Sequence, residues 1–229
     1  LLPAVQVARR PLARSGTGEP VTVIRVDATI IEAATCKEPS VTGHYKHGIG
    51  WHPLTAWCSN TDDHLAVMQR PGNAGSFTAS DHVLVLDAAL EQVPAPHRRD
   101  VLVTIDGAGA SHDVIDHLTG LNTFKEHGRR GRRVEYTIGW PVDARTRTSI
   151  EEVPEQAWTA RIDPNGDVAP DGGEVAEVTG LLRGSAGGDR LDGWPADMQV
   201  IVSRTPRPIG EQAKLGEDAQ WRYSAFATN

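Results

Sequence analysis

Two aspartates, Asp27 and Asp106, have the side chains and the setting that suit metal chemistry. Asp27 lies within residues 21–31, a run dense in β-branched residues, and Asp106 ends the apolar run 100–106, directly before the glycine turn 107–109. Apolar residues on both faces predict buried strands of a parallel or mixed sheet. A carboxylate is costly to bury alone, so we expect Asp27 to be hydrogen-bonded, paired with a cation, or directed at a metal at the edge of the sheet.

On neighbouring strands, such acids would form a site for Mg²⁺, which prefers hard oxygen ligands. A pair of these ions roughly 3.5 to 4 Å apart activates the attacking oxygen and stabilises the leaving oxygen in phosphoryl transfer. The alternative for Asp27 is a structural role, as a strand acid paired with an arginine. Together with Asp106 and the turn that follows it, the pattern favours the metal site.

The elements that must position these acids follow from local patterns. Strands are expected at 21–31, 49–58, 64–70, 100–106 and 134–140, and helices at about 80–92 and 113–121. Thr78 or Ser80 is expected to cap the first helix and Ser111 the second. We expect the second and third strands to form a hairpin through residues 59–63. This β-β-β-α-β-α-β order predicts an α/β fold with helices flanking a mixed sheet.

The character of the chain changes after residue 140. A short helix is expected at 149–158, followed by strands at 160–168, 174–182, 198–203 and 221–227 between turns rich in glycine and proline. We therefore divide the chain into a linker at 1–20, an α/β core at 21–140 and a β-rich module at 141–229. The start of the sequence resembles a cut within a longer chain rather than a signal peptide.

Composition bounds the class of protein. No apolar run approaches the roughly 20 residues that cross a bilayer, so no membrane partner is expected. Two cysteines, Cys36 and Cys58, make no disulfide framework and favour reduced thiols in the cytoplasm. The net charge of −7 argues against a free-standing nucleic-acid binder, but positive charge is concentrated at Arg129, Arg130, Arg132 and Arg133. These arginines suit either a solvated loop or phosphate contacts.

Other patterns are weaker. His44, His47 and His52 are close enough in sequence for a zinc site but lack a completing ligand, so loop histidines are favoured. The turn 107–109 begins like a dinucleotide fingerprint, yet His112 stands where its third glycine belongs. Residues 163–167 are better explained as a hairpin turn than as a calcium loop.

Several motifs in order resemble DDE transposases of the insertion-sequence 1380 family. They are IRVDAT at 24–29, YKHGIGWHPL at 45–54, RPGNAGS at 70–76, TIDGAGAS at 104–111 and FATN at 226–229. The resemblance implies a ribonuclease-H-like mixed sheet with a β-rich insertion, and three acids that hold two Mg²⁺ or Mn²⁺ ions. Asp27 and Asp106 match the first two acids. A third, a glutamate on a helix, is expected beyond Asn229, since Glu211 and Glu217 match no such motif. A basic end-binding region is expected before residue 1.

The resemblance implies cleavage of DNA at transposon ends and joining to a target, by a homodimer in a bacterial cytoplasm. It adds Lys46 and Arg70 to the arginine cluster as phosphate contacts. With two of three acids, the chain itself is expected to be weakly active or inactive. One alternative is a non-catalytic DNA-binding or interaction module derived from such an enzyme. Another is a phosphatase or nuclease that acts on small substrates.

Overall fold

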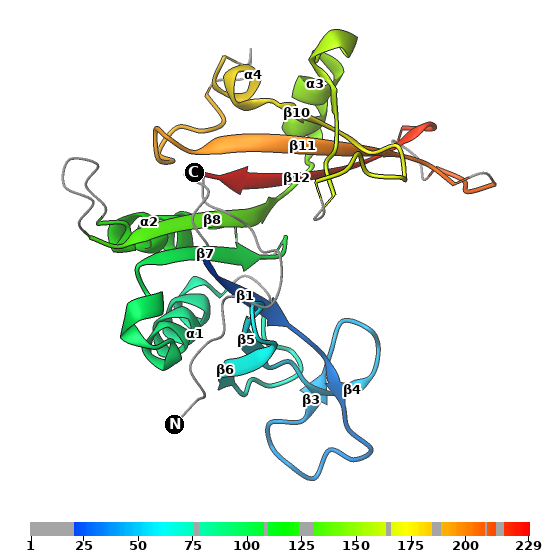
Figure 1. Cartoon of the computed structure of the whole chain (residues 1–229). Helices are drawn as coiled ribbons and strands as arrows, with labels where there is room; N and C mark the ends of the chain where they lie inside the picture. The colour runs from blue at the N-terminus through cyan, green and yellow to red at the C-terminus, as the bar shows by residue number, and fades with distance from the viewer. Residues whose placement is uncertain are drawn as a thin grey trace. The chain divides into compact units, whose positions relative to one another are not determined.

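The computed structural model describes residues 21–75, 78–107, 110–123, 131–163, 166–184, 189–208, 210–213 and 218–229. The chain forms two compact units, Leu1–Thr137 and Ile138–Asn229, which we call unit 1 and unit 2. Both combine strands and helices, so the mixed α/β class expected from the sequence is confirmed (Figure 1).

The main sheet of unit 1 is built around β1. Its strands lie in the order β6-β5-β1-β7-β8. Their bounds are β1 Thr22–Ala28, β5 Leu54–Cys58, β6 Asp63–Met68, β7 Asp100–Ile105 and β8 Arg133–Trp140, of which β8 belongs to unit 1 up to Thr137. β1 runs antiparallel to β5 and parallel to β7, and β5 and β6 form the expected antiparallel hairpin. The sheet of unit 1 is therefore mixed, with β1 between a hairpin and a parallel neighbour.

Among the described residues, unit 1 also contains the helices α1 and α2 and a short 3-10 turn, η1, at Ala95–His97. α1, Ala79–Gln92, packs against β5, β6 and β1, and buries His82, Val85, Leu86, Ala89 and Leu90. The expected inward face included Val83, which is only half-buried. α2, His112–Leu121, begins where the Ser111 side chain accepts a hydrogen bond from the Val114 N–H, and it buries the expected Val114, Ile115 and Leu118.

Alternation along the strands separates the two faces of this sheet. On β1, Ile24 and Val26 are buried, whereas Arg25 and Asp27 are exposed. On β7, Val101, Val103 and Ile105 are buried, and the residues that alternate with them are half-buried. One face of unit 1 is thus an apolar core, and the other carries the polar residues of β1, β5 and β7.

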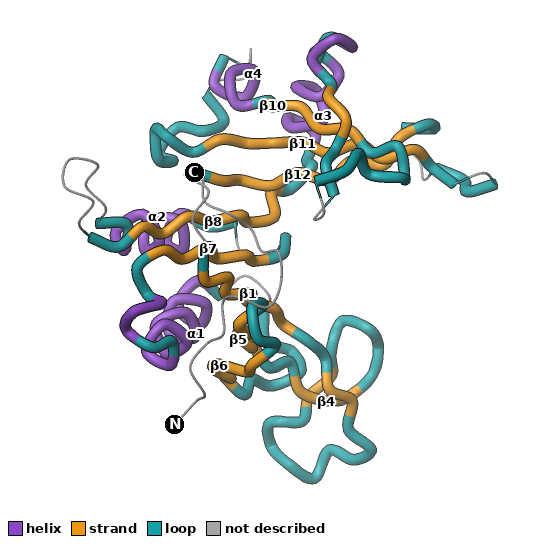
Figure 2. The backbone as a smooth tube through the Cα atoms, in the orientation of Figure 1, coloured by secondary structure: helices purple, strands orange, loops and turns teal. Residues whose placement is uncertain are grey.

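The first and second expected strands are each broken in two. β1 ends at Ala28, and the next residues of the run form β2, Ile31–Glu32, which belongs to a separate small sheet with order β2-β4-β3. β3 spans Thr42–Gly43 and β4 spans Ile49–Trp51, so His52 and Pro53 interrupt the expected strand 49–58. Long loops surround this small sheet (Figure 2).

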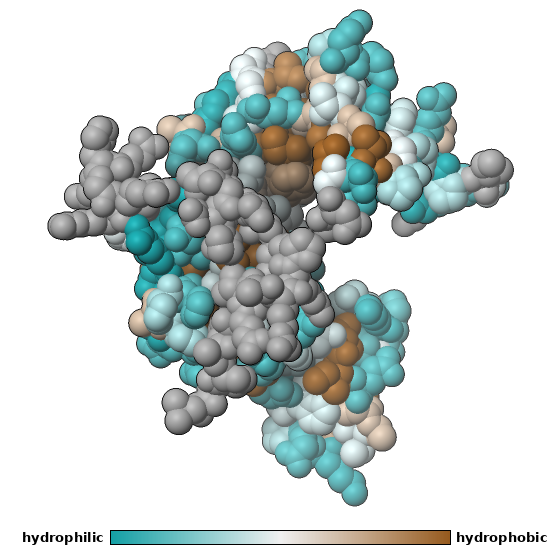
Figure 3. Space-filling model, in the orientation of Figure 1, coloured by the Kyte–Doolittle hydropathy of each residue, from teal (hydrophilic) through white to brown (hydrophobic). Residues whose placement is uncertain are grey.

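The small sheet also carries exposed apolar side chains. Ile31 is 47% exposed and Ile49 is 37% exposed, and a brown apolar patch lies over this part of the molecule in Figure 3. Gly50 is required in β4, because a Cβ there would clash with the Ile31 carbonyl of β2. The small sheet therefore depends on close backbone contact more than on a core of its own.

In unit 2 the strands are antiparallel and lie in the order β12-β11-β10-β9. Their bounds are β9 Thr159–Ala160, β10 Glu174–Glu177, β11 Gln199–Pro206 and β12 Trp221–Thr228. The expected helix at 149–158 is displaced: α3 spans Ala144–Glu151 because Asp143 caps it through the Thr146 N–H, and a 3-10 turn, η2, follows at Glu155–Ala157. The expected strand 174–182 ends early, since α4 occupies Thr179–Arg183. No helix among the described residues has the length and apolar character to cross a membrane.

Candidate active site

The two predicted acids meet at one edge of the sheet of unit 1. β1 and β7 are parallel neighbours whose pairing ends at Val26 and Ile105. Asp27 and Asp106 are the next residue of each strand, so they leave the sheet side by side. Adjacent strands lie about 4.8 Å apart, and residues in register direct their side chains to the same face. The sheet therefore brings both carboxylates to its carboxyl edge.

Both acids are exposed there, which differs from the buried setting expected for Asp27. The reason is alternation, because Asp27 shares the polar face of β1 with Arg25 rather than the core face. On the other side of β1, Asp27 is the register partner of Thr55, whose hydroxyl donates to the Asp27 carbonyl at 3.1 Å. The Asp27 backbone is therefore held by β5 while its carboxylate faces solvent.

A third protein ligand is not found in the part of the chain that the structure describes. No group of three or more histidine, cysteine or acidic side chains in those ranges is placed to hold a metal ion. Two exposed carboxylates at one edge still provide hard oxygen donors, which suit Mg²⁺ or Mn²⁺.

The described arginines of the predicted DNA-binding cluster, Arg132 and Arg133, lie at the end of the sheet away from Asp106. The Arg133 N–H donates to the Arg99 carbonyl at 2.7 Å, which places the start of β8 beside the start of β7. Asp106 follows the other end of β7, about 20 Å away at the usual rise of a strand. Arg132, next to Arg133, is held by Thr123, whose hydroxyl accepts from the Arg132 N–H. Arg129 and Arg130 lie outside the described residues.

Lys46 and Arg70 differ sharply in exposure to solvent. Lys46 is exposed in the turn between β3 and β4, with its ammonium 5.6 Å from the centre of the Tyr45 ring. Arg70 is 3% exposed. Its guanidinium donates to the carbonyls of His52 and Gly75 and pairs with Asp81 at 3.2 Å. Arg70 therefore holds a loop to α1, and only Lys46 of the two is placed to meet a phosphate.

No family model matches this chain, and no curated protein does. Among solved structures, the chain is similar to a piggyBac transposase, seen by cryo-EM in a synaptic complex with hairpin DNA. The identity is 12% and the TM-score 0.43, over 91% of this chain and 33% of the transposase. This chain thus spans about a third of the length of that protein. A likeness of this extent does not assign the chain to a family.

The three histidines near Lys46 do not converge on a metal. His44 is 7% exposed, and its Nδ1 accepts from the Lys46 N–H at 3.3 Å. The Nδ1 of His52 donates to the Ala74 carbonyl at 3.0 Å. These bonds hold loops, which agrees with the preference for loop histidines. Ile162 and Val168 form an antiparallel bridge on either side of residues 163–167, which agrees with the preference for a hairpin turn over a calcium loop.

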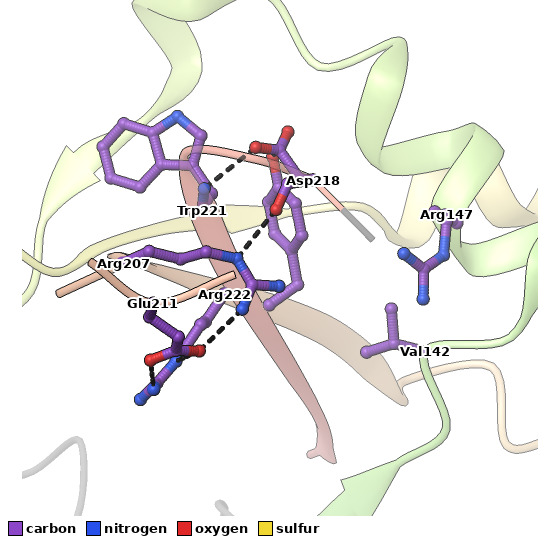
Figure 4. Close-up of a pocket in the computed structure, with 8 residues that line it drawn as sticks. Val142, Arg147, Arg207, Glu211, Asp218, Trp221 and Arg222 are labelled. Atoms are coloured by element: carbon purple, nitrogen blue, oxygen red, sulfur yellow. Dashed lines mark hydrogen bonds and ion pairs between the residues drawn. The ribbon is translucent and has the colours of Figure 1, made fainter. Parts of the chain in front are cut away.

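Unit 2 contains a cavity of about 370 Å³ that sequence reasoning missed. Figure 4 shows its lining side chains, which are Val142, Arg147, Arg207, Glu211, Asp218, Trp221, Arg222 and Tyr223. Glu211 bridges Arg207 and Arg222. Its carboxylate is therefore used in ion pairs with two arginines. Glu217 lies outside the described residues.

Asp218 organises the same cavity. Burial alone would raise the pKa of Asp218, but hydrogen bonds from the N–H groups of Gln220 and Trp221 outweigh burial and lower it. The Tyr223 hydroxyl donates to Asp218 at 3.3 Å. Burial, followed by the Asp218 charge, raises the pKa of Tyr223 to about 12. Asp218 is thus a charged acceptor that orders the start of β12.

Proposed function

We propose that unit 1 is the catalytic core of a metal-dependent DNA phosphoryl-transfer enzyme of the DDE transposase type, with a ribonuclease-H-like sheet. The observation that carries the proposal is the register of β1 and β7, whose last partners, Val26 and Ile105, directly precede Asp27 and Asp106 at one edge of the sheet. The sequence motifs around both acids support the same function.

In this proposal Asp27 and Asp106 hold Mg²⁺ or Mn²⁺ through their carboxylate oxygens. When bound, the metal supplies positive charge that activates the attacking oxygen, from water or a 3′-hydroxyl, and stabilises the leaving oxygen. The protein contributes the rigidity of a parallel strand pair and an exposed edge that a phosphodiester can approach. Because only two acids meet among the described residues, we expect weak cleavage by this chain.

Calorimetric titration with Mn²⁺ and a nuclease assay on DNA test the proposal. Asp27→Asn and Asp106→Asn should each abolish Mn²⁺ uptake and any cleavage, because each removes half of the ligand pair. Asp100→Asn is the matched control, since Asp100 lies on β7 at the end far from Asp106. Efficient cleavage by Asp27→Asn would contradict the assignment.

A second candidate function is a non-catalytic DNA-binding module. The observation that favours this function is that no third acid joins Asp27 and Asp106 among the described residues. DNA binding that depends on salt and survives the double change Asp27→Asn with Asp106→Asn, without Mn²⁺ uptake by the parent, would establish this alternative.

A further inference from the structure

The face of the main sheet that carries the acids also carries a cation and an aromatic ring. Arg25 lies two residues before Asp27 on β1, so both side chains leave the same face. Its register partners are Trp57 on β5 and Thr104 on β7. One row across the sheet is therefore Trp57, Arg25 and Thr104, and the next row towards the carboxyl edge holds Asp27.

Trp57 is held in a defined orientation on this face. Its indole N–H donates to the Thr55 hydroxyl at 3.1 Å, and that hydroxyl donates to the Asp27 carbonyl. On the other side, His64 of β6 meets the Trp57 ring edge to face, with the ring centres 4.7 Å apart. The indole is half-buried, so part of it remains accessible. A rigid aromatic side chain of this kind costs little entropy when a ligand stacks on it.

Arg25 is available for a ligand. It is exposed, and no hydrogen bond, ion pair or ring contact holds its guanidinium among the residues that the structure describes. An arginine fork binds a phosphate through two parallel hydrogen bonds. It is also the cation nearest in sequence to Asp27, and alternation directs both to one face.

We propose that this face, which we call the Arg25–Trp57 platform, binds single-stranded DNA. A base stacks on Trp57, the adjoining phosphate contacts Arg25, and the strand continues towards Asp27 and Asp106. The ligand is single-stranded because the bases of a duplex are stacked on one another and leave no ring face for an indole. The proposal rests on the proposed function only in taking DNA as the substrate.

Fluorescence anisotropy of a labelled oligothymidylate, titrated with the full chain in EDTA, tests the platform without any metal. Trp57→Leu should weaken binding by at least roughly fivefold, the lower end of the loss for one stacked base, and Trp57→Phe should retain most of the affinity. Arg25→Gln should weaken binding and lower the slope of log K against log salt by roughly 0.7, the value for one phosphate of a single strand.

Arg145→Gln is the matched control for charge, because Arg145 is exposed on α3 of unit 2 and, among the described residues, no hydrogen bond or ion pair holds it either. It should bind like the parent. The platform is wrong if Arg25→Gln and Trp57→Leu both bind within twofold of the parent, or if Arg145→Gln loses as much affinity as Arg25→Gln. Arg25→Gln is an exposed substitution, so it decides the matter even if Trp57→Leu does not fold.

The two proposals fail in different experiments. Asp27→Asn and Asp106→Asn should bind the oligothymidylate at least as tightly as the parent, since each removes a negative charge near the strand. Loss of binding in these variants would overturn the path proposed for the strand. Failure of the metal proposal would appear in the Mn²⁺ titration and leave the measurements in EDTA unchanged.

Discussion

Asp27 and Asp106 directly follow Val26 and Ile105, the last register partners of two parallel strands. Two like charges at about one strand spacing are expected to destabilise the metal-free fold. Asp27→Asn should therefore raise the melting temperature without metal by about 1 to 4 °C, which corresponds to up to roughly 1 kcal/mol in a chain of this size. Mn²⁺ should stabilise the parent and leave Asp27→Asn unchanged, because only the parent keeps both ligands.

Differential scanning calorimetry with and without Mn²⁺ measures both effects. Asp100→Asn again serves as the control and should respond to Mn²⁺ like the parent. Equal stabilisation of the parent and Asp27→Asn by Mn²⁺ would show that the ion binds elsewhere.

Helix caps and the spacing of apolar residues correctly predicted several helices and strands of unit 1. Ser111 and the apolar spacing of residues 114, 115 and 118 define α2, and an unbroken apolar run defines β7. The two acids were found in the same way, since each follows or interrupts such a run. The end of β1 at Ala28 was not predicted, because Ile31 is as β-prone as the residues before it and only pairing with β4 removes it from the main sheet.

Residues that depend on register were missed. Arg25 lies two positions from Asp27, so alternation alone indicates a shared face, but its neighbour Trp57 follows only from the pairing of β1 with β5. The family resemblance implied that Arg70 contacts phosphate, which requires an exposed guanidinium, but Arg70 is buried. Its guanidinium is buried because Asp81 and the carbonyls of His52 and Gly75 bind it, and the local sequence around Arg70 does not reveal these partners.

The contrast between Arg70 and Lys46 gives a second prediction. Arg70→Lys should lower the free energy of unfolding by about 2 to 4 kcal/mol, because a lysine cannot replace the guanidinium bonds to the His52 carbonyl and Asp81. Lys46→Gln should change stability by less than about 0.5 kcal/mol. If Lys46 contacts a duplex phosphate, Lys46→Gln lowers the salt slope of DNA binding by roughly 0.9. Urea unfolding and binding titrations measure these quantities, and a fully stable Arg70→Lys would contradict the structural role.

Glu135 predicts a pH dependence. Burial, which outweighs the nearby Arg133 charge, raises the pKa of Glu135, and the Asp100 charge raises it further. A raised pKa in the folded state means that folding is favoured when Glu135 is protonated. This contribution is complete below the unfolded value near 4.5 and is lost as the pH rises through the folded pKa.

Glu135→Gln should therefore stabilise the fold at pH 7 and have little effect at pH 4. The gain should stay below about 1 kcal/mol, because solvent reaches much of the side chain. Thermal unfolding of the parent and Glu135→Gln at both pH values measures it. A larger gain at pH 4 than at pH 7 would reverse the assigned sign.

Arg204 gives the sharpest prediction for unit 2. It is 4% exposed, and its guanidinium lies 4.2 Å from the centre of the Trp158 ring and 4.3 Å from that of Trp221. The same group pairs with Glu155 through both terminal nitrogens and donates from Nε to Glu174 at 2.6 Å. The hydrogen bonds from Arg204 lower the pKa of Glu155, so both groups remain charged at neutral pH.

Arg204→Lys keeps the charge but loses the planar fork and the stacking, so unit 2 should lose about 2 kcal/mol or more of stability. Glu155→Gln should cost far less, because Glu155 is largely exposed and Glu174 still pairs with Arg204. Urea unfolding followed by tryptophan fluorescence compares the variants. If Arg204→Lys were as stable as Glu155→Gln, the two indoles and Glu174 would contribute little, and β10 and β11 would be joined by their backbone hydrogen bonds alone.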